Sequence, residues 1–126
     1  MELRKIKIED NLYLYKMLGK INSEASTGIL SIKVFLNGWK QSPLQIDFVT
    51  WDDSLIGYPL NTGFPLLNSF TGEKDIINLN RPKYIKECVL YGLKNGWDGK
   101  NKVQILDGLK MLEDLGYDIS VLIPEK

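Results

Sequence analysis

The sequence predicts one α+β domain, in which an N-terminal antiparallel sheet of about four strands is followed by two C-terminal helices packed on one face of the sheet. Two patterns predict this fold. Apolar residues alternate with a period of two in the first half of the chain and recur at helical spacing in the second half. Because a length of 126 residues suits a single ordinary domain, we expect residues 1–126 to share one core.

Three runs in the first half of the chain alternate apolar and polar side chains, as strands do when one face lies in a core. These runs are 6–8, 12–19 and 30–36. Asn37-Gly38 then favours a hairpin turn, and a further alternating run at 44–48 supplies the partner strand. Because Pro43 has no N–H to donate to a ladder, we expect a loop of about five to seven residues between these strands rather than a two-residue turn.

The segment 51–79 has no sustained hydrophobic period and is interrupted by Gly and Pro. Its apolar content is too high for a disordered segment. We therefore expect packed or functional loops there, with one short strand at Ile76-Ile77.

The second half of the chain predicts two helices. Asn80 is the expected N-cap of the first helix, Pro82 lies in its first turn, and Asn95-Gly96 ends it. Gly92 falls on the apolar face of this helix, where close packing against the sheet would accommodate a glycine.

A second, shorter helix is expected from Asp107, its N-cap, to Leu115, with Gly116 after the last turn. The apolar residues 121–123 precede Pro124. They predict either a final edge strand or a tail docked on the core.

The chain contains no His and a single Cys, Cys88. This composition excludes Ser-His-Asp and Cys-His catalytic arrangements and the H-E-x-x-H zinc site. The sequence also contains none of the glycine-rich nucleotide-binding motifs. Cys88 falls on the apolar face of the first expected helix, so we expect a buried and inert thiol. We therefore expect no catalytic residue, no metal and no cofactor.

Basic and acidic residues number 16 each, so the formal net charge is zero. A chain without a net positive field lacks the attraction on which nonspecific nucleic-acid binding depends. No run approaches the ~18 apolar residues that a membrane span needs, and the N-terminus lacks the apolar region of a signal peptide. We expect a cytoplasmic protein that binds neither nucleic acid nor a membrane.

The segment between Lys40 and Lys74 contains no Lys or Arg but several acidic and aromatic residues. Aromatic side chains dominate interface hot spots and acidic groups steer a basic partner, so this stretch predicts a protein-binding surface. Most of its aromatic residues, Phe64 and Phe70 among them, are expected in the core. The candidate contact residues are Asp47, Trp51, Asp52, Asp53 and Tyr58.

Two other classes of function stay open. Carboxylates at Asp47, Asp52 and Asp53 could together bind Mg²⁺ or Ca²⁺ in a metal-dependent enzyme, although a solvated turn is the commoner origin of such residues. Exposed aromatic residues or a free strand edge would instead suit a homo-oligomer or a structural module of a larger complex.

Trp97 precedes a loop that carries Lys100 and Lys102, and a basic loop beside an aromatic ring can hold a phosphate or a base. The loop is short, however, and Asp98 offsets its charge. We therefore expect Trp97 to fold back on the preceding helix while the Lys side chains are solvated.

The segment 84–97, with the sequence YIKECVLYGLKNGW, is an expected helix that closes on Gly96-Trp97. It resembles the C-terminal part of small uncharacterised bacterial proteins, some of which are similar to immunity proteins of toxin systems. The resemblance implies a non-enzymatic protein that binds and occludes a cognate toxin, and it assigns no functional residue. The acidic stretch fits this expectation, because an inhibitor of a basic toxin such as a nuclease would present acidic groups.

Overall fold

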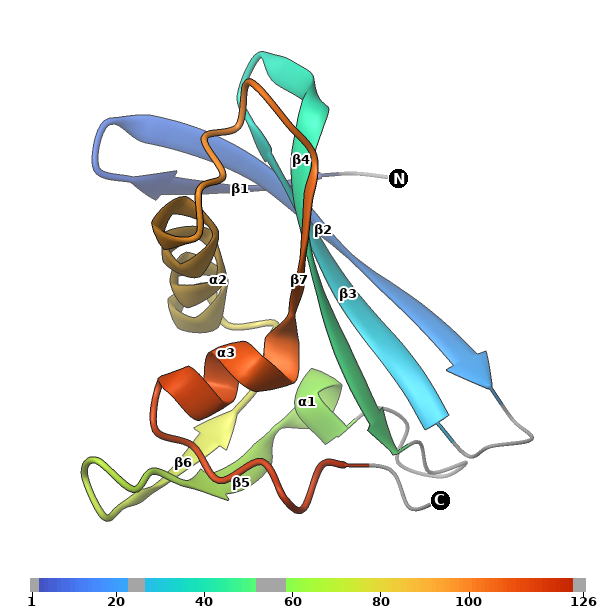
Figure 1. Ribbon diagram of the computed structural model, residues 1–126, viewed down its shortest axis with the longest axis vertical. Helices are drawn as coiled ribbons and strands as arrows, with labels where there is room; N and C mark the ends of the chain where they lie inside the picture. The colour runs from blue at the N-terminus through green and yellow to red at the C-terminus, as the bar shows by residue number, and fades with distance from the viewer. Residues whose placement is uncertain (1–2, 23–26, 52–58, 124–126) are drawn as a thin grey trace.

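The computed structural model describes residues 3–22, 27–51 and 59–123. The fold is α+β, as predicted: a five-stranded sheet in the order β1-β2-β3-β4-β7 carries helices α2 and α3 on one side (Figure 1). A smaller sheet pairs β5 with β6. In chain order the elements are β1 (Arg4–Ile8), β2 (Asn11–Asn22), β3 (Thr27–Leu36), β4 (Trp39–Trp51), α1 (Pro59–Thr62), β5 (Phe64–Leu67), β6 (Lys74–Ile77), α2 (Pro82–Lys94), β7 (Gln104–Asp107) and α3 (Gly108–Asp114).

Strands β1 to β4 form an antiparallel meander in which each strand pairs with the next. The expected alternating runs lie in these strands. β2 is longer than the run that predicted it, because Gly19 pairs with Leu30 inside the ladder and the strand continues to Asn22.

The turn between β3 and β4 is tighter than expected. Asn37-Gly38 forms a two-residue turn with the glycine at a φ of +88°, and Leu36 pairs with Trp39 across it. The expectation of a longer loop is therefore wrong, since Pro43 lies inside β4. The β3–β4 register shifts in this region, so the missing N–H of Pro43 falls in an irregular part of the ladder.

Strand β7 was not predicted from the sequence. It pairs in parallel with β4, from Leu44↔Gln104 to Asp47↔Asp107. Four residues are too few to show a hydrophobic period, and Leu106 is the member of β7 that packs against the core. The sheet is therefore mostly antiparallel with five strands, rather than antiparallel with about four.

The segment after β4 contains more regular structure than expected. The short strand expected at Ile76-Ile77 is part of β6, which pairs antiparallel with β5. β5 and the single-turn helix α1 were not predicted, because Gly and Pro interrupt any period there.

Pro82 lies in the first turn of α2 as predicted, and the helix ends at Lys94, followed by Asn95 as the C-cap. Its N-cap is Arg81, whose side chain makes no capping hydrogen bond, so the prediction that Asn80 caps the helix is wrong. Arg81 is extended, the conformation favoured before proline, and that places the helix start at Pro82. A Cβ at Gly92 would overlap the Leu44 side chain, which confirms that this glycine allows close packing on β4.

Helix α3 follows its prediction at both ends. The Asp107 carboxylate accepts hydrogen bonds from the N–H groups of Leu109 and Lys110, at 3.0 and 3.4 Å. Leu115 is the C-cap and Gly116 follows at a φ of +101°. Of the two expectations for 121–123, the docked tail is observed: Leu122 is fully buried, and its carbonyl accepts a hydrogen bond from the Trp51 N–H at 3.3 Å.

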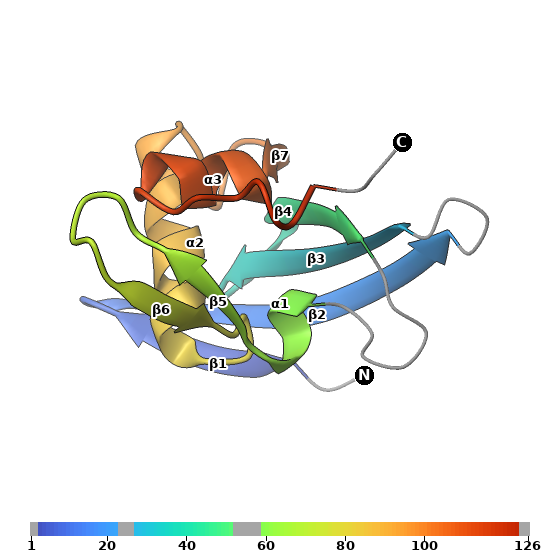
Figure 2. The ribbon, with the colours of Figure 1, turned by 90° about the horizontal axis from the view of Figure 1, so that it is seen from below.

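The core lies on the side of the sheet that faces α2, α3 and the β5–β6 hairpin, as Figures 1 and 2 both show. We call this side the inner face. Every second side chain of β3 and β4 points into it and is fully buried or nearly so: Leu30, Ile32, Val34, Leu44, Ile46 and Phe48. The helices cover them with buried apolar side chains, namely Ile85, Cys88, Val89, Met111 and Leu112. One continuous core therefore joins sheet, helices and hairpin.

Candidate functional site

The opposite side of the sheet, which we call the outer face, has no described helix or hairpin over it (Figures 1 and 2). The strand register assigns to it the even-numbered positions of β2 and the odd-numbered positions of β1, β3, β7 and residues 45–51 of β4. Its charged residues are Lys5, Lys7, Lys16, Lys20, Lys33, Asp47 and Asp107. Lys therefore prevails on the strands from β1 to β3, and Asp lies on β4 and β7.

Asp47, a predicted contact residue, lies on the outer face in the middle of β4 and is half-buried. Its Oδ1 accepts hydrogen bonds from the Ser31 hydroxyl at 2.6 Å and from the Gln45 amide at 2.9 Å. Ser31 lies directly opposite it in β3. In the described part of the chain Asp47 forms no ion pair, so neutral donors alone hold its carboxylate in place.

Trp51, the second predicted contact residue, lies at the end of β4 and fastens the C-terminal segment to the sheet. Its indole N–H donates to the Val121 carbonyl at 2.7 Å, and its ring meets the Phe64 ring edge-on at 5.8 Å. The register is regular from Asp47 to Trp51, so the two residues have the same strand parity, about 13 Å apart along the strand. The Trp51 indole nevertheless packs against Phe64 of β5, a strand on the inner side of the sheet, so Asp47 alone of the two is an outer-face side chain.

The other predicted contact residues, Asp52, Asp53 and Tyr58, lie outside the described residues. A metal site built from Asp47, Asp52 and Asp53 therefore stays a hypothesis. Within the described ranges, no three Asp, Glu or Cys side chains form a group that could hold a metal ion. The carboxylate opposite Asp47 is that of Asp107, and it already caps α3.

The Lys residues of the outer face were missed at the sequence level. Lys16 and Lys33 are direct partners across the β2–β3 ladder. Lys33 also places its ammonium 5.9 Å from the centre of the Phe35 ring. The sequence contains both Lys residues in alternating runs, but only the register of the hairpin shows that they face each other.

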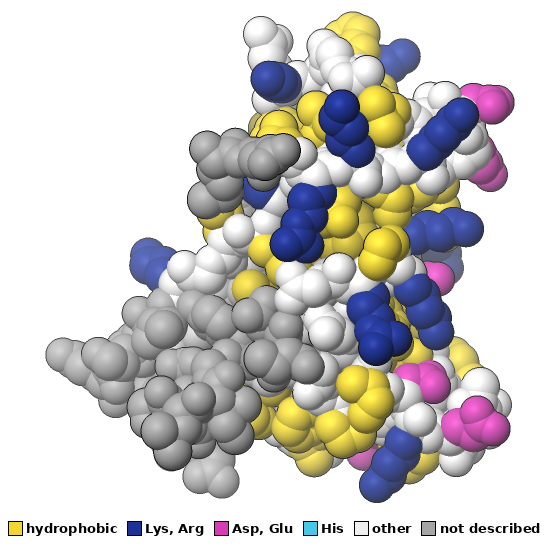
Figure 3. Space-filling view, turned by 180° about the vertical axis from the view of Figure 1, so that it is seen from behind, with side chains coloured by type: hydrophobic (Ala, Val, Ile, Leu, Met, Phe, Trp, Pro, Cys, Tyr) yellow, Lys and Arg dark blue, Asp and Glu magenta, His cyan; other side chains and the backbone are white. Residues whose placement is uncertain are grey.

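Basic side chains continue around the edge of the sheet at β1. Figure 3 views the molecule from behind and shows Lys and Arg side chains spread over that side, with hydrophobic side chains between them and acidic ones gathered towards its right border. β1 contributes Arg4, Lys5 and Lys7 to the exposed surface. The charges that β1 contributes are therefore all positive although the whole chain is neutral.

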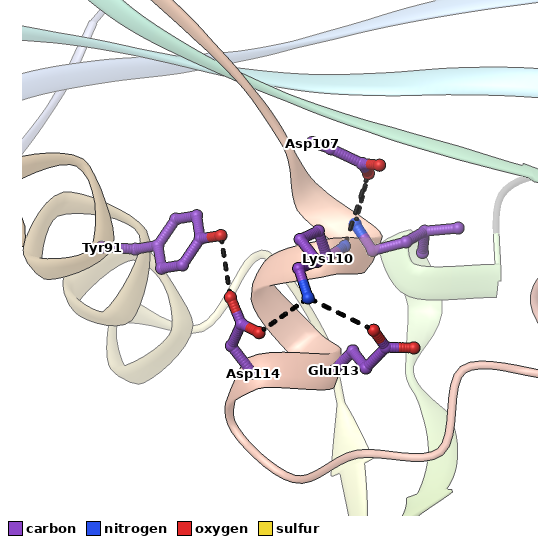
Figure 4. Close-up of polar contacts among 6 residues, drawn as sticks. Tyr91, Asp107, Lys110, Glu113 and Asp114 are labelled. Atoms are coloured by element: carbon purple, nitrogen blue, oxygen red, sulfur yellow. Dashed lines mark hydrogen bonds and ion pairs between the residues drawn. The ribbon is translucent and has the colours of Figure 1, made fainter. Parts of the chain in front are cut away.

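A polar cluster between α2 and α3 has a structural explanation (Figure 4). The Tyr91 hydroxyl donates to Asp114 at 3.0 Å, and the Lys110 ammonium lies 3.2 Å from Asp114 and 3.6 Å from Glu113. Lys110 lowers the pKa of the Asp114 carboxyl, and the Tyr91 hydroxyl acts in the same direction. These contacts join the two helices, and the cluster is not a candidate site.

Cys88 and Trp97 also have structural roles. Cys88 is fully buried, and burial raises the pKa of its thiol, so the thiolate needed for chemistry is suppressed as predicted. The Trp97 N–H bonds back to the Gly92 carbonyl at the end of α2. The buried indole packs beside Tyr13 and donates to the Ser42 carbonyl at 2.8 Å, so it joins the helix end to the sheet.

The aromatic residues of the middle segment divide between core and surface. Phe64 packs partly buried against the core, as expected. Phe70 is 75% exposed, so its expected burial is wrong. Its N–H bonds to the Asn68 side chain at 2.8 Å and its ring lies over Gly116, so the turn holds the ring on the surface.

Comparisons of this chain with protein-family models, with curated proteins and with solved structures find no match. None of the described helices has the length and apolar character needed to cross a membrane. The site must therefore be interpreted from its own residues.

Proposed function

We propose that this chain is a small cytoplasmic bacterial protein that functions by binding another protein, in the manner of an immunity protein that occludes a cognate toxin. The outer face of the sheet is the proposed contact surface, and it includes Asp47. One observation carries the proposal: this face is left uncovered by the described chain although it presents several apolar side chains.

The apolar side chains support a protein partner because they share one face, on which Ile29 and Val49 are direct cross-strand partners. Leu18, Val49 and Ile105 are 37%, 41% and 63% exposed, so binding would remove apolar surface of each side chain from contact with water. Leu14, Ile29 and Phe35 lie half-buried among them on the same face. Single exposed apolar residues are ordinary, whereas a group on one face that is bordered by charges is typical of a protein interface.

The form of the surface suits occlusion. Ladder hydrogen bonds fix the strands of the outer face, so a partner would meet a preorganised surface and little ordering entropy would be lost. A protein that inhibits by covering a site needs no nucleophile or general base, and the absence of His accords with that mode of action.

The test is an affinity capture from lysate of the native host, made with the wild type and two double variants. Leu18→Gln/Val49→Gln changes the outer face, and Leu90→Gln/Leu93→Gln changes two side chains of α2 that are each 38% exposed. We expect one stoichiometric partner that is retained by the α2 variant and lost by the outer-face variant. A partner that both variants retain would place the contact surface elsewhere.

A further inference from the structure

We propose that the protein bound by the outer face has an acidic surface, which five Lys side chains of β1, β2 and β3 recognise. We call these residues the Lys cluster: Lys5, Lys7, Lys16, Lys20 and Lys33. The inference rests on the proposed function and adds the chemistry of the partner. It is opposite in sign to the expectation that acidic side chains of this chain meet a basic toxin.

The repulsion inside the Lys cluster is the first argument. Lys16 and Lys33 are cross-strand partners on one face, a geometry that brings their Cβ atoms within about 4.5–5.5 Å. Like charges placed directly opposite each other destabilise a sheet. Among the described residues the ion pairs all involve Lys110 on α3, so neither Lys of this pair has an acidic partner. A bound carboxylate would convert this repulsion into attraction.

The spacing of apolar side chains within the cluster is the second argument. Leu14 lies between Lys5 of β1 and Phe35 of β3 in one cross-strand row. Lys20 lies beside Ile29 in another. Charged and apolar side chains therefore alternate across the face, and a complementary surface must offer carboxylates separated by apolar side chains. Acidic protein surfaces provide that combination.

A nucleic acid or an anionic membrane fits this face less well. The outer-face positions of β1, β2 and β3 hold no Arg, the side chain whose planar fork binds phosphate groups in a bidentate manner. The formal charge of the whole chain is zero, so it lacks the field that draws proteins to polyphosphates.

The first experiment titrates the isotope-labelled protein with a short synthetic peptide of Glu, Leu and Ser, followed by NMR. A matched peptide has Lys in place of Glu. We expect the Glu peptide alone to shift backbone signals of the outer face on β1, β2 and β3, and its binding to weaken between ~50 mM and ~500 mM salt. Absence of binding, or shifts confined to other surfaces, would overturn the proposal.

A pair of charge reversals locates the interaction. In the Lys16→Glu/Lys33→Glu variant we expect the Glu peptide to bind about tenfold more weakly or worse, because like charges then meet across the interface. Lys83→Glu/Lys86→Glu makes the same change of net charge at two exposed residues of α2 and should leave the affinity nearly unchanged. Equal loss in both variants would mean that net charge, and not the Lys cluster, determines binding, and would overturn the proposal.

Two further probes separate the classes of partner. A DNA duplex and vesicles of anionic lipid are titrated under the same conditions. Weaker binding of both than of the Glu peptide supports the proposal, whereas tighter binding of either one, lost on Lys16→Glu/Lys33→Glu, would overturn it in favour of that class. Concentration-dependent light scattering that is abolished by the same variant would overturn it in favour of a second copy of this chain.

The proposed function and this inference can fail separately. If the native partner is lost by Leu18→Gln/Val49→Gln but is still captured by Lys16→Glu/Lys33→Glu, the contact surface stands and the acidic partner does not. If neither variant loses the partner, the contact surface itself is wrong.

Discussion

Phe48 and Val49 are neighbours in β4, but Phe48 is fully buried on the inner face and Val49 is 41% exposed on the outer face. The same contrast holds along most of β3 and β4, because alternate side chains of a strand point to opposite sides. The inner face meets two helices and a hairpin, while the outer face keeps a repulsive Lys pair and exposed aliphatic side chains. The inner face therefore determines stability, and the composition of the outer face must be explained by something other than folding.

The largest expected effect tests that contrast at the two neighbours. Phe48→Ala should lower the free energy of unfolding by about 3–5 kcal/mol, because it leaves a cavity beneath α3. Val49→Ala should change it by less than about 1 kcal/mol, because the site is partly solvated. Chemical denaturation measures both variants. Similar losses would mean that the outer face is packed and is no free surface.

A smaller effect is expected where α3 approaches the sheet. A Cβ at Gly108 would overlap the Phe48 ring, so Gly108→Ala should destabilise the fold by about 1–3 kcal/mol through overpacking. The smaller side chain in Phe48→Leu should relieve part of that cost. A double-mutant cycle by thermal or urea unfolding tests this, and strictly additive losses would argue against the close contact.

Asp107 tests the comparison of the two faces at their boundary. Its position in β7 has the register of the outer face, whereas its carboxylate caps α3. Asp107→Ala should lower the free energy of unfolding by about 1 kcal/mol through loss of the cap. Asp107→Asn should retain most of the stabilisation by the cap, because the Asn side-chain oxygen can accept the same hydrogen bonds. Urea unfolding distinguishes the two variants. An equal loss in both would show that the charge, and not the capping oxygen, is what matters.

The smallest expected effect is a gain. Lys16→Glu places opposite charges across the β2–β3 ladder and should stabilise the protein by about 0.2–1 kcal/mol, a gain that salt should reduce. Lys20→Glu is the control, because Lys20 lies opposite Ile29 rather than another Lys. Equal shifts in the melting temperature of the two variants would show that the facing Lys residues do not repel each other appreciably.

Local chemistry was enough to predict several elements. The end of α3 at Gly116 needs a positive φ, and Asn37-Gly38 indicated the hairpin, although the longer loop expected there was wrong. The need for a residue without a side chain where α2 meets β4 was also predicted, at Gly92. Each of these rests on the type of one or two residues at a turn, at a helix end or on an apolar helix face, which a sequence displays directly.

Pairing between distant segments could not be predicted in the same way. β7 has four residues and is held in the sheet by pairing with β4. That long-range pairing produces no hydrophobic pattern in the sequence of β7 itself. The facing of Lys16 and Lys33 depends on hairpin register, which a sequence does not show. Of the predicted contact residues, Asp47 lies on the outer face and Trp51 packs against Phe64 of β5, whereas a role for Asp52, Asp53 or Tyr58 stays a prediction.

The parallel pairing of β4 with β7 has a consequence for synthesis on the ribosome. Leu44 pairs with Gln104, so β4 acquires its second neighbour only after 60 more residues have been made (104 − 44). At roughly 5–20 residues per second, the nascent meander waits about 3–12 s with its β4 edge open and its apolar side uncovered by the later helices. Open edges of that kind invite pairing with other chains. If translation stopped before residue 104, the β4 edge would stay open and the apolar side of the meander would stay uncovered. Chaperones and proteases would then treat the product as a misfolded protein.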